Sequence, residues 1–257
     1  IIIAKDEEKM LASCLKSIGR PNQWAREIIL VDNDSKDETV ELAKNWGAKI
    51  VRSKTQSFSE SRNKGAVASS CGWILYIDAD ERLTPELCSE IDSLIRSGQQ
   101  FGAYAIPRRN FILGQELRFG GWWPDYVKRL FRKDKLKGWQ GQLHEEPVFE
   151  GELGHLKNPL VHIKHENFSE MVEKTDRWSD IEAKLMFEAN HPRMNILRFL
   201  SGMAREFWQR MIVRAAFLDG TTGIMFALYQ VFSRFISYAK LWEMQQDKSD
   251  IKYQKSK

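Results

Sequence analysis

The sequence predicts an α/β protein in which a mostly parallel sheet is flanked by helices. Short apolar runs alternate with segments of helical periodicity over residues 1 to about 105, as in chains built from βαβ units. The apolar runs are unbroken, which is typical of strands covered on both faces. Beyond residue 100 the pattern changes, and we expect a mixed sheet over 101–166 and a helical extension over 167–247.

Strands and helices alternate along the first 100 residues. Each expected strand is a short apolar run, and each expected helix has a recognisable cap or apolar residues at helical spacing. Gly47 suits the left-handed position after a helix, and Thr84 followed by Pro85 is a typical helix start. In chain order the expected elements are strand Ile1–Ala4, helix Glu7–Ile18, strand Glu27–Val31, helix Thr39–Trp46, strand Lys49–Arg52, helix Ser59–Ser70, strand Trp73–Ile77 and helix Thr84–Arg96.

The rest of the chain is first strand-like and then helical. Loops rich in Gly and Trp separate short apolar runs, a pattern that favours a mixed or antiparallel sheet. From Ser169, taken as a helix cap, the sequence is helical, with a turn at Gly220 and Gly223 and a disordered polar tail over 248–257. The expected strands are Ala103–Pro107, Val127–Phe131 and Leu160–Ile163.

Composition excludes several classes of protein. Of the 257 residues, 42% are hydrophobic and 29% charged, which excludes disordered and collagen-like chains. There is no apolar run long enough for a spanning helix and no basic segment typical of a signal peptide at Ile1–Glu8. Three cysteines at no metal-ligand spacing indicate a reducing cytosol. The net charge of +4 is too small to indicate a nucleic-acid partner.

Two carboxylates follow the fourth expected strand. Asp78 and Asp80 come directly after Trp73–Ile77, at the carboxyl edge where open α/β sheets bind ligands. Carboxylate oxygens suit hard cations such as Mg²⁺ or Mn²⁺, which keep coordination positions open for phosphate oxygens. The alternative for a lone Asp-x-Asp pattern is a solvated turn at the end of a strand.

A second expected strand also ends in an acid. Asp32 follows the second apolar run and precedes a polar turn that opens the helix at Thr39. Its carboxylate could accept hydrogen bonds from a ribose hydroxyl or a base N–H. Helix capping accounts for Ser35 and Asp37, but Asp32 lies before the cap.

Basic residues occupy the start of the third expected helix, between the two acidic strand ends. Arg62 and Lys64 lie in Phe58–Gly65, and both arginine and helix N-termini favour phosphate. A solvated helix face is the alternative.

The order of these motifs resembles the nucleotide-sugar-binding half of family 2 inverting glycosyltransferases, which have the GT-A fold. The resemblance covers residues 1–96 and joins the acidic first loop, Asp32, Arg62-Asn63-x-Gly65 and Asp78-Ala79-Asp80-Glu81 in one order. Within that family the chain is most similar to the lipopolysaccharide core β-1,4-glucosyltransferase group. The strings that suggest this group are Asp78–Glu81, Asp125–Phe131 and Leu143–Glu145.

The resemblance implies a role for each motif. Residues 1–100 would be the nucleotide-sugar-binding half of one GT-A domain, and 101–166 its acceptor and catalytic half. Asp32 would contact the uracil or ribose of a UDP-sugar, and Glu7 and Arg62 would help to hold this donor. Asp78 would lie near the ribose or sugar, and Asp80 would bind the divalent metal. The chain departs from the family at Asp6, where Asn is usual.

An inverting transfer needs a base that deprotonates the acceptor hydroxyl. The resemblance favours Glu145, which lies in a loop rich in glycine and aromatic residues. Asp125 is the second candidate, and a helix-capping or surface role is the alternative for Glu145.

Four further residues each have two interpretations. Trp122, Trp123 and Trp139 would either stack on acceptor sugar rings or pack against other side chains. His162 matches a family position and is either a further metal ligand or a hydrogen-bonded structural histidine.

Residues 194–242 combine aromatic side chains with arginine. They hold ten aromatic residues and six Lys or Arg against two acids. Such helices can lie at a membrane interface with arginines reaching the lipid head groups, which agrees with the lipid-linked acceptors of the resembling enzymes. The alternatives are packing on the catalytic domain and a homodimer contact.

Three functions fit these observations. The leading one is a metal-dependent inverting glycosyltransferase that moves a hexose from a UDP-sugar to a saccharide or lipid-linked saccharide hydroxyl at the cytoplasmic face of the membrane. A nucleotidyltransferase that forms sugar nucleotides would have a basic, Gly-rich first loop, whereas Lys5–Glu8 is acidic. A non-catalytic saccharide-binding protein would not need the intact pair of Asp78 and Asp80.

Overall fold

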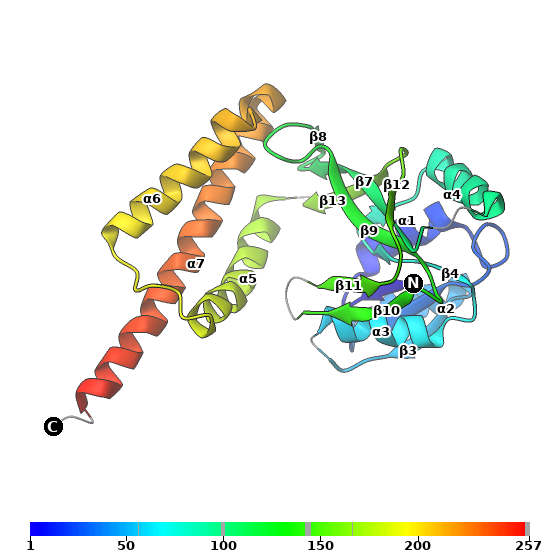
Figure 1. Cartoon of the computed structure of the whole chain (residues 1–257), viewed down its shortest axis with the longest axis horizontal. Helices are drawn as coiled ribbons and strands as arrows, with labels where there is room; N and C mark the ends of the chain where they lie inside the picture. Colours follow the sequence, from blue (N-terminus) through cyan, green and yellow to red (C-terminus); the bar gives the residue numbers. More distant parts are fainter. Residues whose placement is uncertain (56, 99–100, 142–144, 166, 255–257) are drawn as a thin grey trace. The chain divides into compact units, whose positions relative to one another are not determined.

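The computed structural model has two compact units (Figure 1). It describes all residues except 56, 99–100, 142–144, 166 and 255–257. The unit that we call the sheet unit comprises Ile1–Arg109 and Pro124–Ile163. The helical unit comprises Asn110–Trp123 and Lys164–Lys257, and so includes a segment that the sequence placed in the mixed sheet.

A four-stranded parallel sheet forms the first part of the sheet unit, in the order β3-β2-β1-β5. In its register Ala4 lies opposite Asp32, and the neighbouring Ile3 lies opposite Asp78. The two acidic strand ends therefore lie on either side of β1 at the same edge of the sheet. The strands are β1 (Ile2–Ala4), β2 (Ile29–Asp32), β3 (Lys49–Arg52) and β5 (Ile77–Asp78), and the helices between and after them are α1 (Glu8–Ile18), α2 (Thr39–Trp46), α3 (Phe58–Ala68) and α4 (Pro85–Ser97).

A second, mixed sheet follows the order β4-β9-β7-β13-β6, and β12 and β8 also pair with β7. Most of its pairs are antiparallel, whereas β12 runs parallel to β7. The α/β class, with its parallel sheet and mixed second sheet, is confirmed. The strands are β4 (Trp73–Leu75), β6 (Glu81–Arg82), β7 (Ala103–Ile112), β8 (Gln115–Leu117), β9 (Asp125–Arg132), β12 (Leu153–His155) and β13 (Leu160–His165), and β10 (Leu136–Gln140) pairs with β11 (Glu146–Phe149) in a separate hairpin.

The expected strand Trp73–Ile77 is in fact divided between the two sheets. The N–H of Tyr76 donates to the carbonyl of Arg129 (2.9 Å), and the N–H of Ile77 donates to the carbonyl of Ile1 (3.0 Å). Periodicity could not predict this division, because both parts of the strand are buried and apolar. The fully buried Tyr76 therefore marks the point where the chain passes from the mixed sheet to the parallel sheet.

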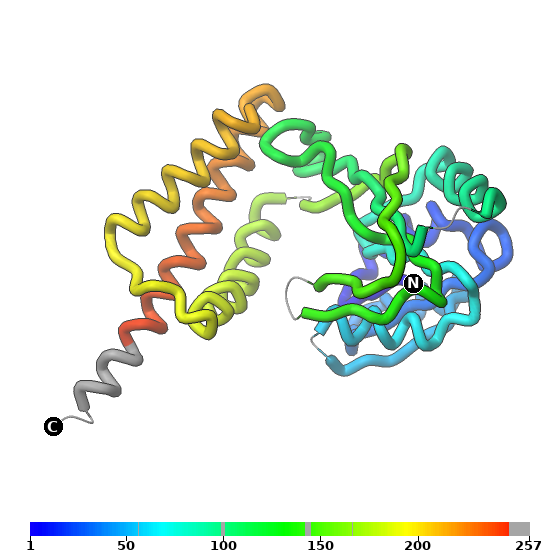
Figure 2. The backbone as a smooth tube through the Cα atoms, viewed as in Figure 1, coloured from blue at the N-terminus to red at the C-terminus, as the bar shows by residue number. Residues whose placement is uncertain are grey.

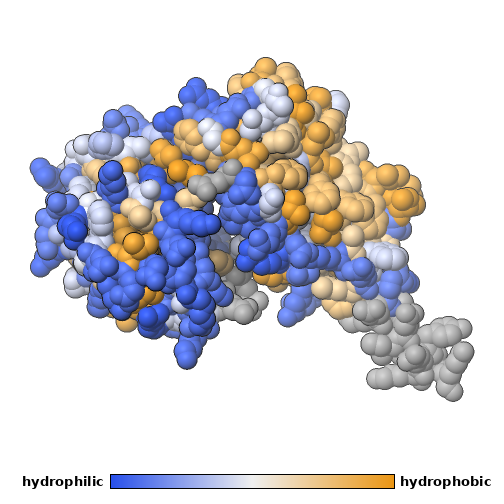
Figure 3. Space-filling view, turned by 180° about the vertical axis from the view of Figure 1, so that it is seen from behind, coloured by the Kyte–Doolittle hydropathy of each residue, from blue (hydrophilic) through white to orange (hydrophobic). Residues whose placement is uncertain are grey.

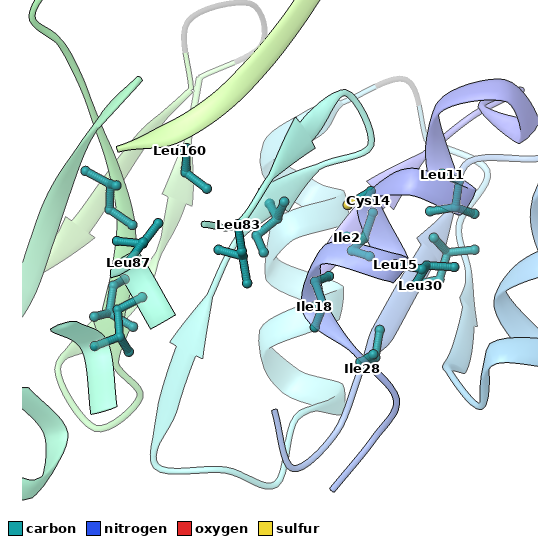
Figure 4. Close-up of a cluster of buried hydrophobic side chains, with 14 of the residues drawn as sticks. Ile2, Leu11, Cys14, Leu15, Ile18, Ile28, Leu30, Leu83, Leu87 and Leu160 are labelled. Carbon is teal, nitrogen blue, oxygen red and sulfur yellow. The ribbon is translucent and has the colours of Figure 1, made fainter. Parts of the chain in front are cut away.

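The main core lies between the parallel sheet and the helices α1 and α4. Figure 4 shows Leu11, Cys14 and Leu15 gathered with Ile2 and Leu30. All three cysteines are free. Burial raises the pKa of the Cys14 thiol to about 12, so this side chain packs as a small apolar group.

The helical unit contains α5 (Phe168–Glu188), α6 (Ile196–Phe207) and α7 (Gly220–Gln254). Asn167, and not Ser169 as expected, caps α5, since its side chain accepts from the N–H of Glu170 (2.9 Å). A π-helical turn and a 3₁₀ turn connect α6 to α7, and the chain reverses its direction there (Figure 2). The helix α7 continues beyond residue 247, where the sequence placed its end.

Among the described residues, no single helix is long and apolar enough to cross a bilayer. The segments Ile196–Val213 and Ala216–Gln246 meet the length and composition test only as a pair, which is bent by 63°.

Helix α3, which carries Arg62, lies directly on the parallel sheet. A Cβ atom at Gly65 would come within 2.6 Å of Ile1 Cγ2 and 3.1 Å of Val31 Cγ2. Glycine at this position therefore allows the backbone of α3 to approach β1 and β2 closely. Ser57 begins the helix by accepting from the N–H of Glu60.

We predict that Gly65→Val destabilises the protein by about 1–3 kcal/mol, because overpacking forces α3 away from the sheet. Urea denaturation measures the change. Gly72→Val is the matched control, since a Cβ atom there meets nothing within 4 Å. Equal stability of the two variants would contradict the close approach of α3.

Candidate active site

The first loop and the turn after β2 are tied together by hydrogen bonds. The N–H of Lys36 donates to Asp6 Oδ1 (2.6 Å), and the N–H of Glu7 donates to Thr39 Oγ1 (2.8 Å). Asp6 therefore holds the backbone of the neighbouring loop. Glu7 lies at the N-terminal end of α1, in the N-cap position.

Asp32 is fully buried at the end of β2. Its Oδ2 lies 2.5 Å from Arg52 Nη1, and its Oδ1 accepts from the N–H of Ser35 (3.1 Å). These contacts hold the carboxylate at the carboxyl edge of the sheet. Arg52, whose side chain is 60% exposed, was not singled out from the sequence.

A cluster of buried charges lies at the end of β5. Arg129 of β9 donates to both oxygens of Asp78 and to Glu81 Oε1 (2.7 Å). Glu81 is fully buried and Arg129 is 5% exposed, and this guanidinium is the cation that the two carboxylates share. Desolvation would raise the pKa of Asp78, but the charges of Arg129 and Arg62 outweigh it and hold this pKa well below its usual range.

Arg62 connects this cluster to the hairpin of β10 and β11. Its Nη2 lies 3.0 Å from Glu145 Oε1 and 3.4 Å from Asp78 Oδ1. The guanidinium also lies 4.7 Å from the ring centroid of Trp139. Arg62 is 4% exposed, and its Nε and Nη1 have no hydrogen-bond partner among the described residues.

A cavity of about 310 Å³ opens beside these groups. Arg62, Asp78 and Glu145 line it together with Arg129 and Arg108. Asp125 faces Arg108, whose Nη2 and Nε donate to Asp125 Oδ2 at 2.7 and 3.0 Å. The structure thus joins both candidate bases to one network of arginines.

Asp80 and His162 form a separate pair. Asp80 Oδ2 lies 3.4 Å from His162 Nε2, and Asp80 Oδ1 is buried without a hydrogen-bond partner among the described residues. An unpartnered carboxylate oxygen beside an imidazole is a suitable ligand for a divalent cation. Such a cation needs few protein ligands when phosphate oxygens complete its coordination shell. Within the described part of the chain, no group of three or more His, Cys, Asp or Glu residues forms a protein-only metal site.

The tryptophans are packing residues in two of the three cases. Trp139 is buried against Tyr76 and Phe131, so the packing interpretation holds for it. Trp122 packs against Phe226, with ring centroids 5.1 Å apart. Trp123 is 43% exposed. Leu143 and His144 of the motif that suggested Glu145 lie outside the described residues.

Sequence reasoning found Arg62 but missed Arg129 and Arg108 as members of the cluster. Arg129 lies in β9 between Lys128 and Leu130, in a strand that contains both charged and apolar residues. A buried arginine needs acidic partners, but the sequence does not show that Arg129 is buried.

Comparison with known proteins gives a consistent result. The profile of the family described as Glycosyl transferase family 2 matches residues 1–149. An uncharacterized glycosyltransferase of Rickettsia typhi is 27% identical over 255 residues, covering 95% of this chain and 86% of the relative. The lipopolysaccharide core biosynthesis glycosyltransferase LpsC of Rhizobium meliloti is 25% identical over 260 residues, covering 94% of this chain and 90% of the relative.

Among solved structures, Staphylococcus aureus TarS 1–349 in complex with UDP-GlcNAc aligns with a TM-score of 0.47 and 11% identity. The alignment covers 96% of this chain and 90% of that chain.

We predict that Arg129→Met destabilises the protein by about 3–5 kcal/mol at pH 7, because it leaves Asp78 and Glu81 without their common cation. The pairing of Asp78 stabilises the fold above its unfolded pKa of about 3.9 and is lost as the pH falls below that value. The difference between the wild type and the variant should therefore narrow when urea denaturation is repeated at about pH 3, below the unfolded pKa of Asp78.

Arg132→Met is the matched control on the same strand, since Arg132 pairs with the exposed Asp134. We expect a loss below about 1 kcal/mol for it. A difference between wild type and Arg129→Met that stays constant with pH would contradict the role of Arg129.

Proposed function

Because the chain belongs to glycosyl transferase family 2, we propose that it is a metal-dependent inverting glycosyltransferase that moves a hexose from a UDP-sugar to a saccharide hydroxyl. The observation that carries this proposal is the cavity where Arg62 contacts both Asp78 and Glu145. One bound ligand could therefore contact Asp78 on the donor side, the guanidinium of Arg62 through its phosphates, and the candidate base Glu145. Membership of the family also disfavours the nucleotidyltransferase alternative.

The donor would bind along the carboxyl edge of the parallel sheet. Asp32 is held at this edge by Arg52 and the N–H of Ser35, where it can accept hydrogen bonds from the uracil or ribose. Glu7 would line the donor site on the same side as Asp32. Arg62 would contact the diphosphate, since its Nε and Nη1 are buried donors without a partner among the described residues.

Asp80 and His162 would hold the divalent cation, Mg²⁺ or Mn²⁺. The support is the unpartnered Asp80 Oδ1 and the imidazole 3.4 Å from Oδ2. When bound, such a cation neutralises negative charge on the leaving diphosphate. Asp78, already paired with Arg129, would position the ribose or sugar instead.

Glu145 would act as the general base. Its carboxylate would take the proton of the acceptor hydroxyl while the hydroxyl oxygen bonds to the anomeric carbon. The bond from that carbon to the diphosphate oxygen breaks on the opposite face, so the configuration inverts. In the structure Glu145 is paired with Arg62, and a donor diphosphate would compete for the same guanidinium. Asp125 remains the second candidate base.

The acceptor would be a saccharide, free or lipid-linked, of lipopolysaccharide or another cell-surface polysaccharide. This part of the proposal is supported by the similarity to LpsC, which is named for lipopolysaccharide core biosynthesis.

We predict that UDP binds the protein more tightly than GDP or dTDP, that this binding requires Mn²⁺ or Mg²⁺, and that Asp80→Ala abolishes it. Isothermal titration of the three nucleotides, with and without the metal, measures this. Asp134→Ala, at an exposed acid on a turn, is the control and should bind as the wild type does. Undiminished metal-dependent binding by Asp80→Ala would contradict its role.

We predict that Glu145→Gln retains UDP binding but lowers kcat by about 10²–10⁴-fold, because the amide cannot accept the hydroxyl proton. Glu146→Gln is the matched control, since the neighbouring Glu146 is exposed and pairs with Lys128. Unchanged turnover in Glu145→Gln would assign the base elsewhere, with Asp125→Asn as the next variant.

A further inference from the structure

The outer side of α6 is apolar and exposed. Leu197 and Leu200 are 72% and 61% exposed, and their spacing of three residues places them on one side of the helix. Trp208, which is 60% exposed, begins the π-helical turn that follows α6. The other side is already occupied, since Gly202 packs against Tyr238 of α7. The exposed residues therefore have no role in holding α6 against α7.

A second exposed apolar row runs along α7. Ile224, Leu228, Phe232 and Phe235 follow one another at spacings of four, four and three residues, and each is about 40–50% exposed. The opposite side of α7 faces α5, where Tyr229 Oη donates to the carbonyl of Met171 (2.5 Å).

The two rows lie on neighbouring helices of the helical unit, α6 and α7, which pack against each other. Phe199 of α6 contacts Phe235 of α7, with ring centroids 5.8 Å apart. Ile212, Val213, Phe217 and Leu218 extend the exposed apolar surface across the turn between the helices. We call this surface the α6–α7 face, and Figure 3 shows hydrophobic residues gathered over the helical unit. An apolar surface of this extent marks a binding surface.

The charges beside the α6–α7 face are positive. Arg198, Arg205 and Arg214 are exposed, and none has a carboxylate partner within the described ranges of the chain. The two acids of this region are not free to balance them. Glu206 pairs with Arg210 (2.6 Å), and the buried Asp219 accepts from the backbone N–H groups of Arg118 and Phe119.

We propose that the α6–α7 face docks on the surface of a lipid bilayer that carries anionic head groups. The apolar rows would enter the boundary between head groups and acyl chains, and the arginines beside them would contact lipid phosphates. In this arrangement both helices would lie along the surface of the bilayer.

Charge favours a bilayer over a second copy of the chain. In a two-fold homodimer the same patch is used by both copies, so the interface would collect the positive charges of Arg198 and Arg205 from each copy. Like charges across an interface are unfavourable, whereas an anionic lipid surface attracts them.

Vesicle flotation of the full chain tests the proposal. We expect binding to vesicles that contain phosphatidylglycerol, weaker binding to pure phosphatidylcholine, and release at high salt because ions screen the attraction. Arg198→Gln with Arg205→Gln should weaken binding to the anionic vesicles about 30-fold. Leu197→Ser with Leu200→Ser should abolish flotation.

The controls are Val67→Ser, at an 85% exposed valine of α3, and Arg96→Gln, at an exposed arginine of α4. Both should float as the wild type does, and circular dichroism of every variant checks that it is folded.

Failure of the folded wild type to bind either vesicle would overturn the proposal. The proposal would also be overturned if light scattering showed a dimer that dissociates in the variant Leu197→Ser with Leu200→Ser. It would be overturned too if vesicle binding resisted both high salt and alkaline extraction, because such binding indicates an inserted hairpin. UDP titration is independent of all these outcomes.

Discussion

Compensation of buried charge is the constraint on which the candidate site depends. Glu81 has no access to water, and Arg129 has almost none, so burying these charges is costly unless opposite charges lie beside them. The pairing of Glu81 with Arg129 connects β6 to β9, and Asp78 connects the end of β5 to the same guanidinium. Arg62 extends this network from Asp78 to Glu145. The positions of the side chains that line the cavity are thus set by the pairing of buried charges, in addition to the hydrogen bonds between strands.

Much of the fold could be predicted because its signals are local. Thr39–Trp46 and Lys49–Arg52 match their expected bounds, and Thr84 caps α4 as expected. Gly47 adopts the left-handed conformation that ends α2. These features depend on capping, backbone conformation and hydrophobic spacing, all of which are written in neighbouring residues.

The missed features depend on residues that are distant in the sequence. Motif order led to Asp78 and Arg62, the family resemblance led to Glu145, and the structure brings these three together. No local pattern pairs Arg129 with Glu81, 48 positions away, or buries Trp139 against Tyr76. Acids that follow an apolar run can be recognised from the sequence as candidate site residues. A buried arginine can be recognised only when the strand that carries its acidic partner is known.

At Tyr76 the chain passes from one sheet to the other, and this couples the unfolding of the two sheets. The Tyr76 amide is bonded to β9 and the next amide to the first residue of the chain, so a single continuous backbone segment belongs to both sheets. Separating one sheet from the other would break this segment's hydrogen bonds and expose the Tyr76 ring. The two sheets should therefore exchange their most protected amide hydrogens in one cooperative event, as a single foldon.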